Sequence, residues 1–476
     1  MQISTRDFLK KLGLGGAAIA TGAAFGDEWT ASSEKLPAGS VGDPRRPNFG
    51  KFMFDLPHTM TDGASAFLRD GKVVMPAREV PLFHETDVVV VGGGPAGFAA
   101  AVAAAKTGAK VALVERYGSL GGLFTNGMVL IMLATSRKNA DGSHTRVTRG
   151  VCGEFMDRAH ALGPDFCSEE TNRNHRQPTV DPEAAKYLMD RMVEEAKVEM
   201  FFHSWGVDVI QDGNRVLGVV FESKQGRQAI LARQVVDCTG DADMLFRAGG
   251  DYRQISHNIG HDVRLANMDR ITARKAPLGP DGKPLPGPWP TRGNEGNPAT
   301  MWTNWRRPPL DNNGDGLDVR QLSKAEVDFR KYWWEHVETM RKTPGWEQVF
   351  IANTCSQIGP RATRLVETEL VTSRELIARG LDFADTVGWF GHDGAHAAFR
   401  VSYRNILPKK VDNLLVAGRC LGTGDTIDTF RLICPCFVTG QAAGVAAALA
   451  AKKGIAPRAL PYGELRNELV RQNVCL

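Results

Sequence analysis

Residues 86–115 read TDVVVVGGGPAGFAAAVAAAKTGAKVALVE and decide the fold. Their first six residues end in a β-branched run, which is typical of a parallel strand buried on both faces. The Ala-rich stretch 98–107 predicts a helix, and a second strand at 110–114 leads directly to Glu115. Because strand, glycine turn, helix, strand and acid follow in that order, we predict a dinucleotide-binding unit rather than a chance glycine loop.

The glycine turn of this unit, residues 92–97, has the spacing G-x-G-x-x-G. Missing side chains let the backbone turn tightly, approach a pyrophosphate, and pack the helix against the strand. The helix begins near its proline and directs N-terminal amides at that phosphate, while the acid accepts both hydroxyl hydrogens of a ribose. The expected contacts are Gly92, Gly94, Pro95, Ala96, Gly97 and Glu115.

Further motifs follow along the chain. Residues 116–123 add a Gly-Gly turn, and three more motifs lie at 234–243, 356–364 and 411–444. On these motifs the chain, over about residues 87–451, resembles the bacterial FAD-dependent oxidoreductases related to fumarate reductase and succinate dehydrogenase flavoproteins. The resemblance implies FAD rather than NAD as the cofactor. It also implies the contacts Arg116, Gly121, Gly122, Thr239, Gly240, Asp241, Gly418, Arg419, Gln441 and Ala442.

Two of these motifs predict helices. The sequence TGQAAG at 439–444 is expected to begin an Ala-rich helix that runs to about Lys452. Its N-terminus would face the pyrimidine edge of the flavin and stabilise negative charge on the reduced ring. Alternatively, its small residues form a face for close helix packing. In the motif at 356–364, Arg361 and Arg364 are three residues apart and are expected on one face of a helix.

Short alternating segments at 207–210, 215–222 and 227–231 predict a β-meander. We therefore expect an α/β fold: a Rossmann-like FAD-binding domain, with a parallel sheet and a β-meander, plus an inserted substrate or cap domain. A helix at Ser323–Met340, capped by Ser323, falls in the inserted domain. The expected ranges are 1–26 for an export signal, 27–83 for an irregular lead-in, 84–257 and 401–455 for the FAD-binding domain, 258–400 for the substrate domain, and 456–476 for a C-terminal tail.

Candidate catalytic side chains lie in the last third of the chain. His392 and His396 belong to the segment HDGAH, which resembles an Asp-x-His segment of the same group, and histidine exchanges a proton near neutral pH. Tyr403 is a candidate for the pocket lining. Arginines clamp carboxylates bidentately, and the arginines weighed for this role are Arg361, Arg364, Arg404 and Arg431. The alternatives are local loop hydrogen bonds for the histidines and structural ion pairs for the arginines.

Three other patterns suggest chemistry that we do not expect. The pair Cys434 and Cys436 suggests a redox dithiol, but a C-x-C disulfide closes a small strained ring. A calcium loop beginning at Asp311 has Leu322 where a bidentate Glu is required. Covalent flavin attachment to His144 is disfavoured because this residue follows the Gly-Gly turn at the wrong distance. With no C-x-x-C cluster, zinc and iron–sulfur centres are also disfavoured, and no metal is predicted.

The N-terminus predicts export. Basic residues before Leu12 precede a short apolar run to Phe25, as in a signal peptide. The pattern resembles a twin-arginine signal, although Thr5 stands where the first arginine is expected. We expect a periplasmic protein, with a cytoplasmic one as the alternative. No later segment is expected to reach the roughly 20 apolar residues that span a bilayer.

Composition limits the remaining functions. The 476 residues carry a formal charge of only +4, so nucleic-acid binding has no support. No second Rossmann motif is found for a pyridine nucleotide. The leading prediction is a dehydrogenase or reductase that transfers a hydride between FAD and a small organic substrate, with a quinone, cytochrome or other redox protein as electron acceptor. The alternatives are a flavoprotein subunit that passes electrons to a partner protein, as in heterodisulfide-reductase-like or respiratory complexes, and a flavin-binding protein without turnover.

Overall fold

The centre of the structure is strand β3 (Leu82–Val91), whose last four valines are buried. A computed structural model describes residues 66–139, 141–168, 177–272, 276, 278–279, 281–284, 296–303, 313–379, 383–391, 399–422 and 424–476. The chain divides into two units, 1–80 and 81–476. The described part of the first unit is a hairpin of β1 (Phe67–Arg69) and β2 (Lys72–Val74). The predicted export signal lies outside the described residues.

Strand β3 belongs to a seven-stranded sheet with the order β7-β4-β3-β10-β9-β8, and β21 also pairs with β10. The parallel strands are β3, β4 (Val111–Val114), β7 (Glu199–Phe201), β10 (Gly226–Asp237) and β21 (Leu414–Val416). Antiparallel β8 (Trp205–Asp212) and β9 (Arg215–Ser223) complete the predicted meander. The predicted class, an α/β fold with a Rossmann-like parallel sheet and a meander, is confirmed. The meander's last strand continues without a break into the parallel sheet as β10.

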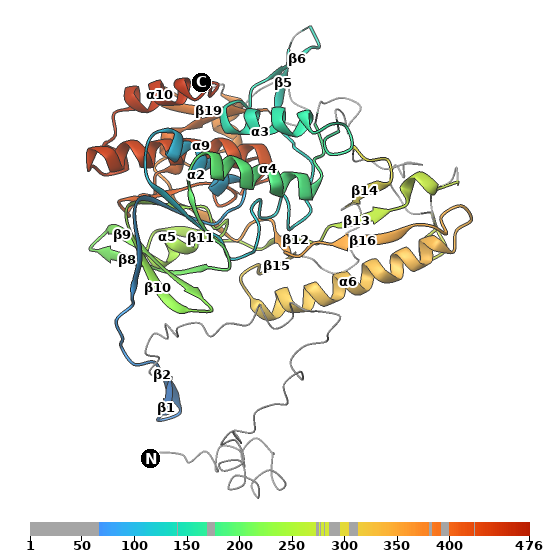
Figure 1. Cartoon of the computed structure of the whole chain (residues 1–476), viewed down its shortest axis with the longest axis horizontal. Coiled ribbons are helices and arrows are strands. Elements are labelled where there is room, and N and C mark those ends of the chain that lie inside the picture. Colours follow the sequence, from blue (N-terminus) through green and yellow to red (C-terminus); the bar gives the residue numbers. More distant parts are fainter. Residues whose placement is uncertain are drawn as a thin grey trace, which may run out of the picture. The chain divides into compact units, whose positions relative to one another are not determined.

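Helices α2 (Pro95–Lys106) and α9 (Ile433–Lys453) pack together beside this sheet (Figure 1). A Cβ atom at Gly440 would lie 2.0 Å from the carbonyl oxygen of Ala96, and one at Gly444 would lie 2.1 Å from that of Ala100. The prediction that residues 439–444 begin the helix is therefore wrong. They lie inside α9, and their small side chains permit the close helix packing that was weighed as the alternative.

Helix α9 also corrects the expectation about apolar segments. It has 21 residues, and an 18-residue stretch within it has a mean hydropathy of 1.6, so it is long and apolar enough to cross a membrane by length and composition. Its apolar stretch is 94% buried inside the fold. Contact with α2 and the sheet accounts for this composition, as in the central helix of a globular core. It is the one helix in the described part of the chain that meets this criterion.

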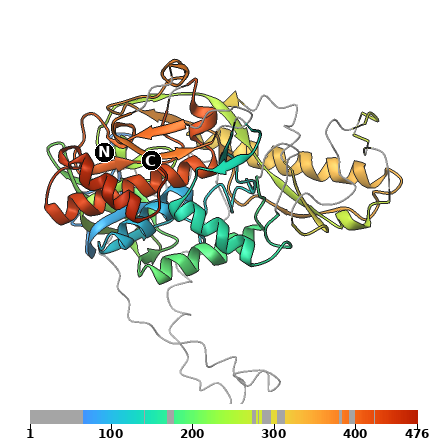
Figure 2. The same ribbon diagram turned by 90° about the horizontal axis from the view of Figure 1, so that it is seen from above.

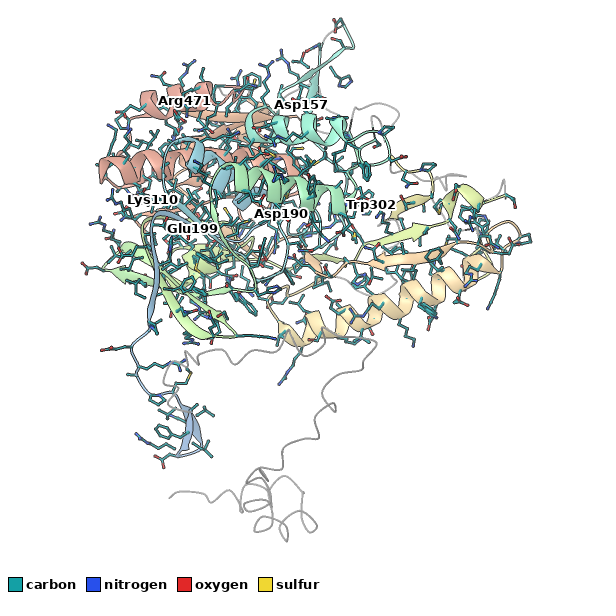
Figure 3. The ribbon with its side chains drawn as sticks, in the orientation of Figure 1. Lys110, Asp157, Asp190, Glu199, Trp302 and Arg471 are labelled. Carbon is teal, nitrogen blue, oxygen red and sulfur yellow. The ribbon has the colours of Figure 1, made fainter. Side chains whose placement is uncertain are left out.

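A second lobe is built on β12 (His257–Gly260), β13 (Val263–Ala266) and the long helix α6 (Val319–Arg341), which lies to one side of the α2–α9 layer (Figure 2). Strand β13 pairs with β14 (Thr300–Thr303) and β16 (Phe350–Thr354), while β12 pairs with β15 (Asn313–Gly314) and β17 (Gly359–Pro360). Trp302 of β14 is labelled in this lobe in Figure 3. The lobe has its own apolar core, which includes Trp333 and Trp346.

Two local predictions in this lobe need correction. Helix α6 begins at Val319, not at Ser323, because the Asp318 side chain caps it by accepting bonds from the Arg320 amide at 2.8 Å and the Gln321 amide at 3.2 Å. Residues 356–364 form no helix, since they contribute β17 and the start of β18 (Arg364–Val366). Arg361 and Arg364 therefore do not share a helix face.

The remaining elements cover the sheet or connect the lobes. They are β5 (Ser136–Lys138), β6 (His144–Arg146), α3 (Gly150–Ala161), α4 (Pro182–Glu195), α5 (Asp243–Arg247), β11 (Tyr252–Gln254), α7 (Arg374–Ala378), β19 (Thr386–Phe390), β20 (Phe399–Ser402), α8 (Ile427–Phe430) and α10 (Tyr462–Arg471), with short 3-10 turns at Met268–Arg270, Tyr403–Ile406 and Pro457–Ala459. The predicted domain boundaries remain predictions.

A buried histidine in the second lobe predicts a loss of stability in acid. The ring of His261 is fully buried and stacks on Phe329 at a centroid distance of 5.4 Å. Glu326 lies 3.7 Å from Nε2, but this carboxylate is already paired with Arg330 at 2.6 Å. Burial and the Arg330 charge lower the pKa of His261 from 6.5 to about 4.

Between pH 6.5 and about 4, His261 binds a proton in the unfolded chain but not in the folded chain. The free energy of unfolding therefore falls as the pH drops through this range. We expect His261→Phe to remove this loss and to gain about 3 kcal/mol over the wild type at the lower end. Denaturant titrations across this pH range measure the difference, with His84→Phe on the partly exposed His84 as the control. An equal pH dependence in the His261→Phe variant and the wild type would contradict the burial argument.

Candidate functional site

A pocket opens where β3, β4, β10 and β21 end, at the carboxyl edge of the parallel sheet. Ligands of open α/β sheets bind at this edge. The pocket encloses about 830 Å³ of empty space, part of it open to solvent, within the range of ligand sites. The predicted cofactor contacts that line it are Gly92, Gly94, Pro95, Ala96, Glu115, Arg116, Gly122, Thr239, Gly240, Gly418 and Arg419.

Its floor is the glycine turn between β3 and α2. A Cβ atom at Gly92 would lie 2.4 Å from the carbonyl oxygen of Cys238, and one at Gly97 would lie 1.7 Å from that of Gly92. A side chain at either position would therefore clash with backbone atoms, so the turn requires glycine at both. Gly94 lines the pocket, and a Cβ atom there would have no contact within 4 Å outside its neighbours in the chain. The turn therefore leaves open space above Gly94, which suits a pyrophosphate.

Glu115 stands at the end of β4 beside this turn. Its carboxylate accepts the Gly93 amide at 2.6 Å and the Tyr117 amide at 2.8 Å, and its residue is only 6% exposed. Burial raises the pKa of Glu115, while these amide bonds act in the opposite direction. Each oxygen keeps a further lone pair, which is what two ribose hydroxyl groups require.

Next to Glu115, aromatic rings hold a cation at the pocket wall. The guanidinium of Arg116 lies 4.9 Å from the ring centre of Tyr117 and 5.6 Å from that of Trp205. All three residues line the pocket. Tyr117 and Trp205 were not predicted as site residues from the sequence. Trp205 belongs to β8, which is distant from Arg116 in the sequence. Stacked planar groups of this kind suit the flat face of a nucleotide base.

The sequence motifs at 234–243, 356–364 and 411–444 meet behind the lining. Asp241 accepts Arg419 Nη2 at 2.8 Å, and its backbone oxygen accepts Arg364 Nη1 at 2.8 Å. Arg364 also pairs with Asp243 at 2.8 Å, while Arg419 Nη1 donates to the Pro360 oxygen at 2.7 Å. Asp241 does not itself line the pocket, so its place is to orient Arg419, which does.

The N-terminus of α9 forms one end of the pocket. Ile433 and Cys436 of its first turn are lining residues, and the N-cap residue Leu432 offers no side-chain cap. The positive end of a 21-residue helix therefore faces the pocket. Gln441, predicted to contact the cofactor, instead accepts the Val151 amide at 2.9 Å and does not line the pocket.

The other predicted contacts off the lining are Gly97, Gly121 and Ala442. Gly97 packs under the turn as described, and the amide of Gly121 donates to the Gly93 oxygen at 2.8 Å, so both shape the pocket from behind. Ala442 is fully buried within α9. The reason is the same as for Gln441: the helix begins six residues earlier than the sequence indicated.

Charged groups gather at the same end of the pocket as α9. Arg431 lines the pocket, and its Nη2 donates to Asp428 Oδ1 at 2.8 Å. His257 Nε2 lies 3.7 Å from the same oxygen, a neighbour that sequence reasoning missed. Burial raises the pKa of Asp428, but the bond and charge of Arg431, with His257 and Arg361, outweigh it and lower the pKa. Arg361 itself does not line the pocket.

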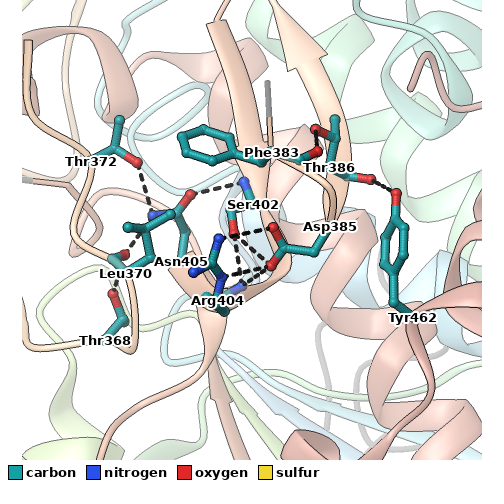
Figure 4. A network of polar contacts seen from close by, with 10 residues as sticks. All are labelled: Thr368, Leu370, Thr372, Phe383, Asp385, Thr386, Ser402, Arg404, Asn405 and Tyr462. Atoms are coloured by element: carbon teal, nitrogen blue, oxygen red, sulfur yellow. Dashed lines mark hydrogen bonds and ion pairs between the residues drawn. The ribbon is translucent and has the colours of Figure 1, made fainter. Parts of the chain in front are cut away.

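The other catalytic candidates lie elsewhere or beyond the described residues. The Tyr403 hydroxyl donates to the Pro457 oxygen at 2.8 Å, and Tyr403 is not a lining residue. Arg404 pairs with Asp385 at 3.0 Å in a network that also holds Ser402 and Asn405, and all four are drawn in Figure 4. This is the structural ion pair weighed as the alternative for an arginine. His392 and His396 fall outside the described residues.

The patterns that we disfavoured are placed as follows. Cys434 is fully buried, and burial raises the pKa of its thiol well above the usual value; the pKa of Cys436, a lining residue, is raised by burial to about 12. His144 lies on β6 and does not line the pocket. Asp311 falls outside the described residues. Among those described, no three His, Cys, Asp or Glu side chains gather as metal ligands.

The residues present fit FAD. Open space above Gly94 suits a pyrophosphate, Glu115 suits a ribose, Arg116 and its rings suit a base, and the α9 N-terminus suits a group that gains negative charge. These features lie along a single pocket. Such an arrangement defines a nucleotide-binding flavoprotein of the Rossmann-like class.

Comparison with known proteins gives the family. A sequence model of the family "FAD dependent oxidoreductase" matches residues 87–469, so the chain belongs to the FAD-dependent oxidoreductase family, an enzyme family whose cofactor is FAD. Dihydrolipoyl dehydrogenase of Manduca sexta is 46% identical over 63 residues, 13% of each protein. Digeranylgeranylglycerophospholipid reductase 1 of Methanopyrus kandleri is 29% identical over 174 residues, 35% of this chain and 42% of the relative. The chain thus matches less than half the length of these relatives.

Solved structures match the chain at low identity and with TM-scores below 0.5. A geranylgeranyl bacteriochlorophyll reductase-like protein from Thermoplasma acidophilum is 14% identical, with 82% of this chain and 84% of that chain covered and a TM-score of 0.38. The flavin-dependent brominase Bmp2 is 13% identical, with 80% and 83% covered and a TM-score of 0.42.

Proposed function

We propose that the chain transfers a hydride between FAD and a small organic substrate, as a dehydrogenase or a reductase. The observation that carries this proposal is that Arg431 and the α9 N-terminus line one end of the FAD pocket. Bound FAD supplies the atom, N5, that accepts or gives the hydride. Positive charge at this end would stabilise the negative charge that a flavin gains on reduction.

In this proposal the chain's residues divide the work. Glu115 and the glycine turn bind the nucleotide, and the α9 amides hold the position where negative charge develops. Arg431 orients the substrate through its guanidinium, and the bond to Asp428 fixes the direction of that side chain. His392 and His396 remain proposals for proton exchange. Arg361 and Tyr403, which lie off the lining, remain weaker proposals for the same site.

Several finer points belong to the same proposal. The resemblance to fumarate reductase flavoproteins and the reductase and dehydrogenase names of the relatives support hydride transfer. We also propose a quinone, cytochrome or other redox protein as electron acceptor, and export by a twin-arginine-like signal in residues 1–26. The basic and apolar pattern of that segment supports export. The alternative, an electron-transfer subunit, is an outcome of the experiment below.

Anaerobic addition of hydroxy acids, sugars, steroids, phenols and NAD(P)H to the purified protein tests the proposal. One class is expected to bleach the visible flavin absorbance. We expect Arg431→Leu to slow that bleaching by about 10- to 100-fold, with FAD content unchanged, because a charged hydrogen bond contributes about 1.5–3 kcal/mol. Arg471→Leu is the matched control, since Arg471 pairs with Glu468 at the same i, i+3 spacing but lies on α10, as labelled in Figure 3.

Equal slowing in the two variants would contradict the role of Arg431. A flavin that no organic donor reduces, but that a partner redox protein does reduce, would replace the dehydrogenase proposal with the electron-transfer alternative.

A further inference from the structure

One side chain in the pocket has a polar atom that the protein leaves unpaired. Gln357 lines the pocket and is 9% exposed. Its Oε1 is buried without a hydrogen-bond partner. A buried carbonyl oxygen without a hydrogen-bond partner destabilises the protein, and a bound ligand that donates to this oxygen would remove that penalty.

The position of Gln357 is fixed by its backbone. Its amide and that of Ser356 both donate to the Asn126 oxygen, at 3.2 Å and 2.8 Å. Asn126 belongs to the segment that follows the Gly-Gly turn, where Gly122 and Leu123 line the pocket. Asn126 Nδ2 is a second buried atom without a partner at the same junction. The other half of the Asn126 carboxamide is paired, since its Oδ1 accepts the Ser119 hydroxyl at 2.9 Å, and Asn126 does not line the pocket. Of these two unpaired atoms, only Gln357 Oε1 therefore belongs to a side chain that a ligand in the pocket can reach.

The chemistry of a carboxamide selects among the parts of FAD. It offers an acceptor and two donors without charge. A pyrophosphate requires cations and backbone amides, and the ribose hydroxyls are matched by Glu115. Adenine also complements a carboxamide, but Arg116 with the rings of Tyr117 and Trp205 is the part of the pocket that suits this base. The pyrimidine edge of the isoalloxazine ring alternates carbonyl acceptors with an N3–H donor, which is the remaining complement of a carboxamide.

We propose that the carboxamide of Gln357 binds the pyrimidine edge of the flavin and contributes to both its affinity and its redox potential. The proposal rests on FAD as the cofactor. It adds a cofactor ligand from the lobe side of the pocket, on the segment that joins β16 to β17. This ligand couples the second lobe to the electronic state of the ring.

The test replaces Gln357 and a matched glutamine. Gln228 on β10 also has a buried Oε1 without a partner, and it does not line the pocket. We expect Gln357→Leu to weaken FAD binding about tenfold, while Gln228→Leu leaves it unchanged. Titration of the apoprotein with FAD, followed by flavin fluorescence, measures the change. The apo form of Gln357→Leu is expected to melt no lower than the wild type, since only an unpaired group is lost.

A second variant tests the effect of residue 357 on the ionisation and redox potential of the flavin ring. Gln357→Glu places negative charge at the pyrimidine edge, so the bound flavin should lose its N3 proton at higher pH. It should also bind the reduced form more weakly relative to the oxidised form, and a tenfold change in that ratio lowers the two-electron potential by about 30 mV. Spectral titration and potentiometry measure both shifts, with Gln228→Glu as the control.

Wild-type affinity, N3 ionisation and potential in both Gln357 variants would overturn this inference alone. A wild-type protein that binds no FAD would instead overturn the cofactor assignment beneath it. A loss of apo stability in Gln357→Leu, with no such loss in Gln228→Leu, would show that Gln357 serves the fold and would also overturn the proposal.

Discussion

Gly94→Val is expected to reduce FAD affinity at least about 100-fold while the apoprotein still folds. The open space around Gly94 lies on the pocket side, so the two methyl groups of valine would occupy the room that the pyrophosphate needs. The backbone of Gly94 has φ −64° and ψ −175°, which any residue adopts. The substitution therefore costs binding without straining the turn.

Gly463→Val is the matched control for this result. Gly463 lies in α10, away from the pocket, and a Cβ atom there also meets nothing within 4 Å. Thermal unfolding of both apoproteins should match the wild type, and equilibrium titration with FAD should separate them. Undiminished FAD binding by Gly94→Val would contradict the placement of the pyrophosphate over the glycine turn.

Gly440→Val is expected to destabilise the protein by about 4 kcal/mol, because α2 and α9 cannot remain in contact. A Cβ atom at Gly440 would lie 2.0 Å from the Ala96 oxygen and 2.7 Å from the Ala96 carbonyl carbon. Both are backbone atoms in the first turn of α2, so no flexible side chain can give way. Since that turn carries Pro95 and Ala96 of the pocket lining, the variant should also lose FAD.

Denaturant unfolding of the apoprotein measures this loss, and Gly463→Val controls for a valine in an exposed helix position. The alternative view of the small residues, in which Gln441 and Ala442 contact the cofactor, predicts a different result. If Gly440→Val unfolds like the wild type but loses FAD, the helix-packing account is wrong and the segment acts at the cofactor.

The fold was largely predictable because its signals are local. The run Val88–Val91, the glycine turn and Glu115 lie within one short stretch, and each constrains the backbone directly. The start of α9 was missed because Pro435 argues against a helix interior. In the structure it lies in the first turn of α9, where the missing amide hydrogen has no helical partner to lose.

The parts of the site that escaped prediction depend on distant segments. Trp205 reaches Arg116 from β8, His257 reaches Asp428 from β12, and Gln357 reaches the Gly-Gly turn through Asn126. The spacing of residues within a single segment does not predict contacts between segments that are distant in the sequence. Cation–π contacts, shared carboxylate oxygens and unpaired amides are properties of the folded arrangement, which only the structure reveals.

The central claim is that this pocket holds FAD, and the most direct test is the flavin that the protein releases. Purified protein is denatured, and the supernatant is analysed by chromatography and absorbance. The account predicts FAD, in a ratio that approaches one per chain after reconstitution of the wild type and stays near zero for Gly94→Val. A wild-type protein that retains no FAD after reconstitution, or Gly94→Val that retains as much as the wild type, would contradict it.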